Sequence, residues 1–114
     1  AVYRLGVVQW LKVDSRNETL CGVRLLPGVP QTIKVRPSNF NIANRQEQEP
    51  ALLLPEIKLP AAPLSIILPV GWFQSGRIIE IQSDDAKADP KRVAKLTSVI
   101  DRGADFDRCL VIIT

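Results

Sequence analysis

The chain has 114 residues, of which 46% are hydrophobic and 24% charged, and its formal net charge is +3. This composition predicts one folded domain with a single core and excludes a fully disordered chain. No apolar run approaches the roughly 20 residues of a membrane span, and no leader resembles a signal peptide. Because the sequence contains no Met and starts just before a predicted strand, we expect residues 1–114 to be a single domain excised from a longer protein.

Three strands in succession are predicted at the start of the chain, over Tyr3–Lys12, Leu20–Leu26 and Gln31–Arg36. Apolar residues alternate along each of them, as expected when one face of a sheet is buried. Two residues break the pattern, because Gln9 falls on the buried face and Trp10 on the exposed one. We expect the three strands to form an antiparallel meander.

The middle of the chain is rich in proline, which cannot donate a ladder hydrogen bond. It therefore favours short edge strands, with Ala51–Leu54 and Leu64–Leu68 as the best candidates. Arg77–Gln82 is a further predicted strand of mostly β-branched residues, and Asp107–Ile113 is the last.

A helix is predicted over Asp89–Arg102. Asp89 can cap it, Pro90 suits its first position, and Gly103 suits the residue past its end. Apolar residues recur inside this range at helical spacing. They are Val93, Leu96 and Ile100.

These elements predict a mainly β fold: a small antiparallel β-barrel of six or seven strands, with the helix packed on an open end and followed by the final strand. The expected core consists of the inward-facing apolar residues. These are Leu5, Val7, Val23, Leu25, Ile33, Val35, Ile66, Leu68, Ile79, Ile81, Val93, Leu96, Ile100, Leu110 and Ile112.

Catalytic and metal chemistry find little support in the residue types. The chain has no histidine, and its two cysteines, Cys21 and Cys109, lack metal-ligand spacing. Both fall in apolar strand patterns, so we expect reduced, buried thiols. No nucleophile motif or phosphate loop is present. We therefore expect no enzyme activity, no bound metal and no cofactor.

The basic excess lies in the opening meander, where six basic and two acidic side chains give residues 1–36 a net charge of +4. On the exposed face, four side chains could stack on a base and hold a phosphate. They are Trp10, Arg24, Lys34 and Arg36. The alternative is a solvated sheet face without a ligand. The excess is too small for a specific DNA- or RNA-binding surface.

Two aromatic residues, Trp72 and Phe73, stand between Gly71 and Gly76. If exposed together, they would form a contact patch for a partner or a second copy. The alternative is that they pack back over one end of the barrel.

Two segments of the meander, Leu5–Leu11 and Leu20–Leu26, resemble the later strands of PilZ domains. In that family a glycine-valine-x-tryptophan strand pairs with a glycine-valine strand. The stretch from Leu64 to Arg108 is similar to extensions of larger proteobacterial proteins that carry such domains. The resemblance implies a bacterial, cytoplasmic β-barrel, often a receptor for cyclic di-GMP.

The ligand motifs of that family are missing. No two arginines are four residues apart, as the family's arginine-x-x-x-arginine segment requires. Asn17–Gly22 matches the outline of the second motif, Asp/Asn-x-Ser-x-x-Gly, but falls after the tryptophan strand instead of before it. The resemblance therefore implies a PilZ-like barrel without the usual ligand machinery.

Three functions compete. The first is a non-catalytic regulatory or interaction domain of a larger bacterial cytoplasmic signalling protein, contacting other domains of that protein or a protein partner. The second is direct binding of cyclic di-GMP or another nucleotide through the basic face. The third, an enzyme, is the least supported.

Overall fold

The computed structural model describes residues 3–38, 48–83 and 91–114, and the regular structure in these ranges is entirely β. Among these residues no helix has the length and apolar character needed to cross a lipid bilayer. All strand pairings are antiparallel. The strands are β1 Gly6–Val13, β2 Thr19–Leu25, β3 Gln31–Pro37, β4 Glu49–Leu54, β5 Ile57–Lys58, β6 Ala61–Ala62, β7 Ser65–Pro69, β8 Ile78–Ser83, β9 Arg92–Arg102 and β10 Phe106–Ile113.

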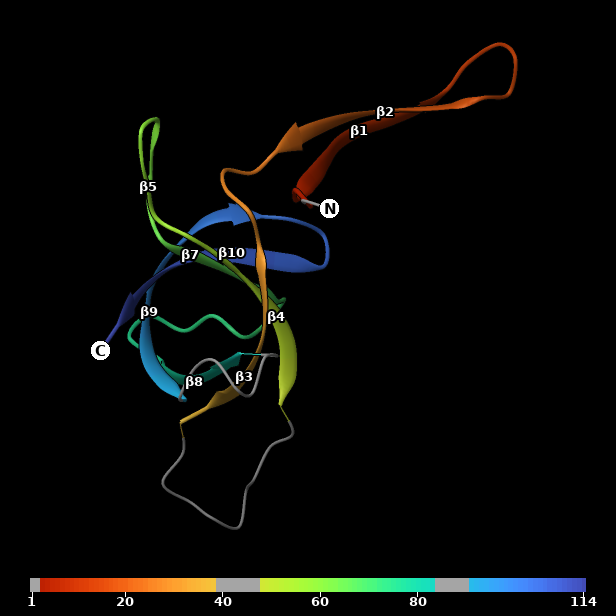
Figure 1. Ribbon diagram of the computed structural model, residues 1–114. Helices are drawn as coiled ribbons and strands as arrows, with labels where there is room; N and C mark the ends of the chain where they lie inside the picture. Colours follow the sequence, from red (N-terminus) through yellow and green to blue (C-terminus); the bar gives the residue numbers. More distant parts are fainter. Residues whose placement is uncertain (1–2, 39–47, 84–90) are drawn as a thin grey trace.

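Six strands close into a barrel in the order β10-β7-β4-β3-β8-β9 (Figure 1). Alternate residues of each strand point inward and fill the barrel, because the side-chain period of a strand is two. Predicted core residues on four of these strands are fully buried. They are Ile33, Val35, Ile66, Leu68, Ile79, Ile81 and Leu96. The predicted β-barrel is therefore confirmed, and closure leaves no sheet edge in this part of the molecule.

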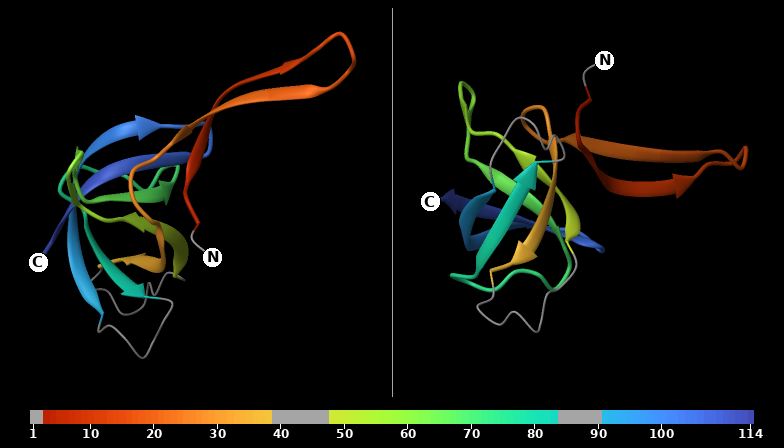
Figure 2. Two further views of the ribbon diagram at one scale, coloured as in Figure 1. Left: turned by 45° about the horizontal axis from the view of Figure 1, so that its top comes forward. Right: turned by 60° about the horizontal axis from the view of Figure 1, so that its bottom comes forward.

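The first two strands stand outside the barrel. β1 and β2 form a separate two-stranded sheet that projects away from it (Figures 1 and 2). A second, much smaller hairpin of β5 and β6 also stands apart from the barrel. The main parts of the chain are thus a closed barrel and one long β1–β2 hairpin, which is joined to β3 of the barrel.

The predicted three-strand meander is wrong, because β3 pairs with β4 and β8 and not with β2. The linker between β2 and β3 contains Pro27 and Pro30, which have no backbone N–H to extend a ladder. Gly28, with a φ of 84°, turns the chain away from the hairpin. Leu26 is buried at this point, so the hairpin ends where the chain enters the barrel.

This arrangement removes four predicted residues from the core. Val23 and Leu25 are exposed, at 52% and 59%, and Leu5 and Val7 are only half-buried. Their apolar alternation is real, but the barrel fills itself without them.

The predicted helix over 89–102 is also wrong. Its described part is β9, an 11-residue strand that pairs with both β8 and β10. β-Branched residues favour a strand here, namely Val93, Thr97, Val99 and Ile100. Asp89 and Pro90, the predicted helix start, lie outside the described residues. Gly103 is not a helix end: it opens the β9–β10 turn, where its N–H donates to the Phe106 carbonyl at 2.9 Å.

Two irregularities interrupt the β9–β10 register. Cys109 lies opposite Val99 and Arg108 opposite Asp101, so Ile100 is an extra residue; Thr97 is skipped in the same way. Such bulges interrupt the period of two. Val93 alternates with buried Ala94 and is exposed, and Ile100 is exposed at a bulge. In β10, which has no extra residue, Cys109 and Val111 are buried in the core, so Leu110 is half-buried and Ile112 exposed.

Candidate interaction site

One side of the β1–β2 hairpin carries only uncharged side chains along its whole length. In an antiparallel pair, residues directly opposite each other share a face. The register pairs Val8 with Val23 and Leu11 with Cys21. The same side includes Val13 at the tip and Leu25 at the base. We call this side the apolar face; its members are Val8, Leu11, Val13, Cys21, Val23 and Leu25.

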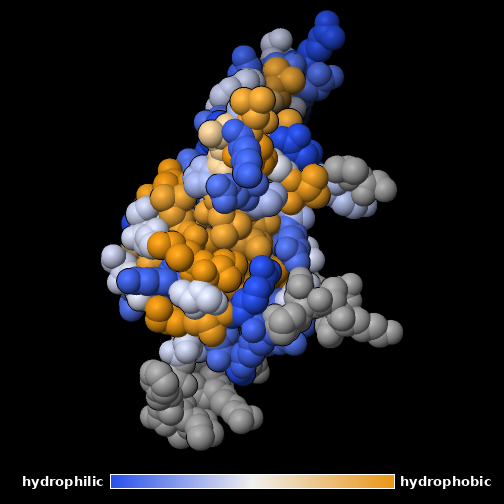
Figure 3. Space-filling view, turned by 60° about the vertical axis from the view of Figure 1, so that its left-hand side comes forward, coloured by the Kyte–Doolittle hydropathy of each residue, from blue (hydrophilic) through white to orange (hydrophobic). Residues whose placement is uncertain are grey.

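The apolar face is open to solvent. Its valines and leucines are 52–67% exposed. A soluble protein rarely leaves so many large aliphatic side chains together without a partner. Figure 3 shows hydrophobic side chains on the projecting part at the top of the view as well as over the barrel.

A bulge in β1 determines which residues belong to this face. The register shifts between Val8 and Trp10, so Gln9 has no opposite residue. The bulge returns Leu11 to the side of Val8 and turns Trp10 to the other side. It also accounts for the two breaks in the sequence pattern, at Gln9 and Trp10.

The opposite face of the hairpin is mixed: it carries the charged side chains of Lys12 and Arg24 together with Val7, Trp10 and Leu20. The Trp10 ring covers Gly22, where an added Cβ would clash with the indole. The Lys12 ammonium lies 5.8 Å from the centre of the Trp10 ring, within cation–π range. The charged side chains of β1 and β2 therefore all lie on this face, and the other face carries none.

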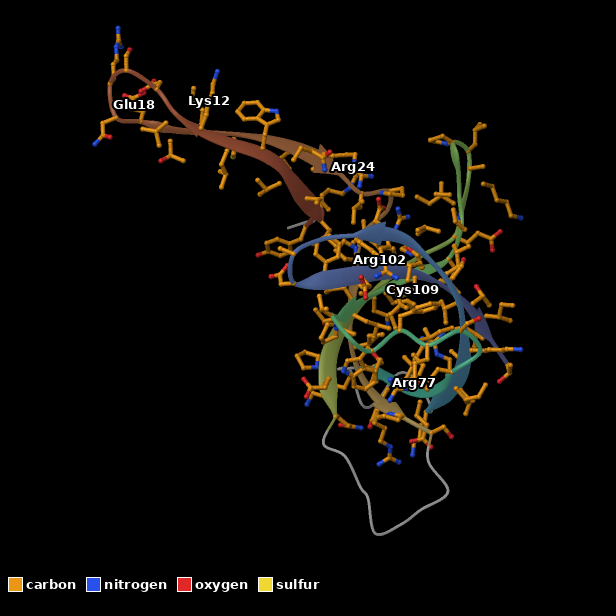
Figure 4. The ribbon with its side chains drawn as sticks, turned by 180° about the vertical axis from the view of Figure 1, so that it is seen from behind. Lys12, Glu18, Arg24, Arg77, Arg102 and Cys109 are labelled. Atoms are coloured by element: carbon orange, nitrogen blue, oxygen red, sulfur yellow. The ribbon has the colours of Figure 1, made fainter. Side chains whose placement is uncertain are left out.

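A chain of charged groups fastens the base of the hairpin to the barrel. Arg24 of β2 donates to Asp101 Oδ1 of β9 at 3.0 Å, and Arg108 of β10 donates to Asp101 Oδ2 at 3.1 Å. Arg108 also donates to the buried Ser65 hydroxyl at 3.0 Å. Figure 4 shows Arg24 near this base, with Lys12 and Glu18 farther out along the hairpin.

Backbone contacts continue this junction. The Leu26 N–H donates to the Leu5 carbonyl at 2.8 Å, and the Arg4 guanidinium donates to the Leu26 carbonyl at 3.1 Å. A cleft of about 570 Å³ remains between residues 6–9 of β1 and residues 102–106 of the β9–β10 turn. The hairpin is thus held at its base and free along its length.

The four residues of the predicted basic site do not gather into one site. Trp10 and Arg24 lie on the hairpin, whereas Lys34 and Arg36 lie on β3 of the barrel. Arg24 is paired with Asp101. Arg36 is paired with Glu80, which also accepts from Lys91 at 3.1 Å.

Glu80 is held as an anion by these cations. Burial raises its pKa, but the hydrogen bonds and charges of Arg36 and Lys91 outweigh that effect and hold the pKa below its ordinary value. Both arginines of the predicted basic site, Arg24 and Arg36, therefore already have carboxylate partners.

The two loop aromatics lie against the barrel. Trp72 and Phe73 are half-buried and pack on the core cluster. Arg77 stacks over the Trp72 ring at 5.1 Å and donates to the Trp72 carbonyl at 2.7 Å. A partner contact through their remaining surface stays a prediction.

The two cysteines differ. Cys109 is buried in the barrel, and burial together with the nearby Asp107 carboxylate raises its pKa to about 11. Cys21 is exposed on the apolar face, so its predicted burial is wrong. Among the described residues, no group of three or more metal-ligating side chains is present.

Sequence reasoning missed the residues of the junction. The predicted helix over 89–102 includes Asp101, and nothing in the sequence connects this residue with Arg24, 77 residues away. The apolar face left a signal, since strand residues 19, 21, 23 and 25 carry no charge. The same signal predicts a buried core, which the structure does not show at these positions.

The comparisons identify the barrel. A family model described as FimW C-terminal beta-barrel domain matches residues 35–110. This range starts within β3 and ends within β10, so the β1–β2 hairpin lies outside it. Neither the search of curated proteins nor the search of solved structures gives a significant match.

Proposed function

We propose that this chain, which belongs to the family of FimW C-terminal beta-barrel domains, is a non-catalytic interaction domain. Its barrel displays the β1–β2 hairpin to another protein domain. The observation that carries this proposal is the apolar face. It has six uncharged members, none of which the barrel covers, although the barrel closes and fills its own core. Exposed aliphatic surface of this kind is typical of a contact site.

The finer part of the proposal concerns the setting. The resemblance of β1 and β2 to PilZ strands supports a PilZ-like domain of a larger bacterial, cytoplasmic signalling protein with a regulatory role. The partner is then another domain of that protein or a separate protein.

Direct nucleotide binding through the basic residues is the less favoured alternative. A phosphate at Arg24 or Arg36 would have to displace Asp101 or Glu80. We therefore expect calorimetric titration with cyclic di-GMP to give no binding tighter than roughly 100 μM, or about −5.5 kcal/mol. A low-micromolar dissociation constant that Arg24→Ala abolishes would make the domain a direct nucleotide sensor.

The interaction function is tested by photo-crosslinking in the organism that makes the protein. A photoreactive amino acid is placed at Val23 on the apolar face and, as a control, at Lys34 on the exposed side of β3. We expect a discrete crosslinked product from position 23 and none from position 34. Equal labelling at both positions, or none at position 23, would contradict an interaction through the hairpin.

A further inference from the structure

We propose that the cleft between the base of the hairpin and the β9–β10 turn binds an extended peptide segment of another protein. The peptide adds to the outer edge of β1 as a further strand. This site goes beyond the proposed function, because it uses the backbone edge of β1 and not the apolar face. Figure 2 shows the β9–β10 turn beside the base of β1, where both border the cleft.

The hairpin wall of the cleft is a strand edge. Four consecutive residues of β1, 6–9, line the cleft. Because side chains of a strand alternate between its two faces, consecutive residues border one cleft along their backbone edge. The other edge of β1 is occupied by β2, and within the described residues β1 pairs with no further strand. The cleft therefore opens onto the unpaired edge of β1.

The register identifies the backbone groups that point toward the cleft. Leu5 and Leu26 continue the β1–β2 register by one residue, and the Leu26 N–H donates to the Leu5 carbonyl at 2.8 Å. Hydrogen-bonded pairs alternate with non-hydrogen-bonded pairs along an antiparallel ladder. Val7 therefore bonds to β2, whereas Gly6 and Val8 direct their N–H and C=O groups to the outer edge. Such a row of donors and acceptors is what an added strand pairs with.

The β9–β10 turn supplies the second wall of the cleft, and this wall carries two opposite charges. Its residues are 102–106, with the Phe106 ring packed over Gly103. Arg102 and Asp105 are exposed, and neither forms an ion pair with another described residue. Figure 4 shows Arg102 on the barrel beneath the base of the hairpin. A peptide with both an acidic and a basic side chain complements this wall.

An extended peptide fits these two walls better than a nucleotide does. A phosphate at Arg102 would meet the Asp105 carboxylate in the same cleft, and it has no N–H groups to donate to the outward carbonyls of β1. In a peptide strand, residues two apart share a face and lie about 7 Å apart. An acidic and a basic residue at such positions can therefore both face the turn.

The free edge of β1 is also short. The bulge at Gln9 interrupts the ladder beyond Val8, and bulges of this kind limit the pairing of a strand edge. A few backbone hydrogen bonds alone give weak binding, so the charges of the second wall decide which peptide is held. The free edge of β2 has no such second wall in this cleft, because no β2 residue lines it.

The test uses the full chain and the acetylated, amidated peptide Thr-Glu-Thr-Lys-Thr. NMR measures its dissociation constant from chemical shifts and the exchange of backbone amides with water. We expect a dissociation constant below ~1 mM, so that the Gly6 and Val8 amides exchange at least about threefold more slowly at ~2 mM peptide. The Val23 and Leu25 amides, which point outward from β2, are the internal control and should be unchanged.

Two further controls separate strand addition from nonspecific adsorption. The same peptide N-methylated at every residue lacks the ladder donors and should not bind. Replacing its glutamate by glutamine should weaken binding to the natural chain about threefold, the scale of an exposed ion pair, and should have no effect on Arg102→Gln. Arg16→Gln, at an exposed arginine of the hairpin tip, is the matched control and should behave as the natural chain does.

Four outcomes would overturn the proposal. The first is unchanged exchange of the Gly6 and Val8 amides at the same peptide concentration, with the hairpin shown to be folded. The second is equal protection of the outward β2 amides, and the third is binding that survives N-methylation. The fourth is a dimer in sedimentation without peptide in which the Gly6 and Val8 amides are already protected, since a second copy would then occupy the edge.

Discussion

The barrel and the β1–β2 hairpin are both built from antiparallel strands with alternating apolar residues, yet they meet opposite conditions. In the barrel, each strand has two neighbours and its apolar residues are buried, as with Ile79 and Ile81 at 0% exposure. In the hairpin, each strand has one neighbour, and Leu11 is 67% exposed. Alternation therefore shows that a strand has an apolar side and does not show what covers it.

We therefore expect the barrel to determine the stability of the chain and the hairpin to determine its binding. Burial of apolar area stabilises a fold by about 25 cal/mol per Å², and that term is concentrated in the barrel. The hairpin adds little of it, since its apolar face stays in water. Changes in the barrel should therefore act on the free energy of unfolding, and changes in the hairpin on binding.

Thiol labelling should give the largest contrast. Cys21 is exposed on the hairpin, whereas Cys109 is buried and its pKa is raised to about 11, which reduces its thiolate fraction at neutral pH. We expect Cys21 to react at least roughly 100-fold faster than Cys109 with a water-soluble maleimide. Mass spectrometry of tryptic peptides measures both rates, and comparable rates would show that the barrel opens readily.

Truncation of one core side chain should give the next largest effect. Ile81→Ala leaves a cavity in the barrel and should lower the free energy of unfolding by about 2–5 kcal/mol. Leu11→Ala on the hairpin is the control, and it should change stability by less than about 0.5 kcal/mol. Urea denaturation measures both. A cost for Leu11→Ala close to that of Ile81→Ala would mean that the hairpin is covered in the isolated chain.

The junction between the two parts should respond to Asp101→Asn. This change removes the negative charge from between Arg24 and Arg108 and leaves the Arg108 side chain, only 8% exposed, without its anion. We expect a loss of about 1–3 kcal/mol in chemical denaturation. Arg24→Ala, at a side chain 44% exposed, should cost less than about 1 kcal/mol. A larger loss in Arg24→Ala than in Asp101→Asn would be inconsistent with this assignment.

Acid should have the smallest effect, and it should act on the barrel. Because Arg36 and Lys91 hold the pKa of Glu80 below its ordinary value of 4.5, the anion stabilises the fold fully above that value. This contribution is lost as the pH falls through the lowered pKa. The thermal midpoint of Glu80→Gln should therefore lie below that of the natural chain at pH 6, and the difference should shrink toward pH 3. A constant difference would exclude Glu80 titration as the cause.

The sequence predicted the barrel where the strands were regular. Ile33, Val35 and Leu68 keep their alternation without interruption, and each is buried as expected. The same reasoning failed in β9 because its apolar spacing predicts a helix. It failed in β10 because the run Leu110–Ile113 is apolar at every position and does not show which side faces inward. Strand propensity in residues 92–102 was a second available signal, but apolar spacing and the apparent caps outweighed it.

The candidate site was harder to predict, because it is exposed only where β3 does not pair with β2. The apolar members of β1 and β2 were recognised as a set, yet only the three-dimensional arrangement shows that β3 leaves them for the barrel. The contacts of Arg24 and Arg36 were equally out of reach, since their carboxylates lie 77 and 44 residues away. Long-range pairings of this kind leave no local signal.

The shared carboxylate of Asp101 also makes the orientation of the hairpin relative to the barrel sensitive to ionic strength. One of its oxygens holds Arg24 of the hairpin and the other holds Arg108 of the barrel. Because Arg24 is exposed, salt weakens its contact much more than that of buried Arg108. A partner that fixes the hairpin in this position strengthens the Arg24 contact, and by reciprocity the contact strengthens the partner's binding. A higher salt concentration should therefore loosen the attachment of the hairpin to the barrel.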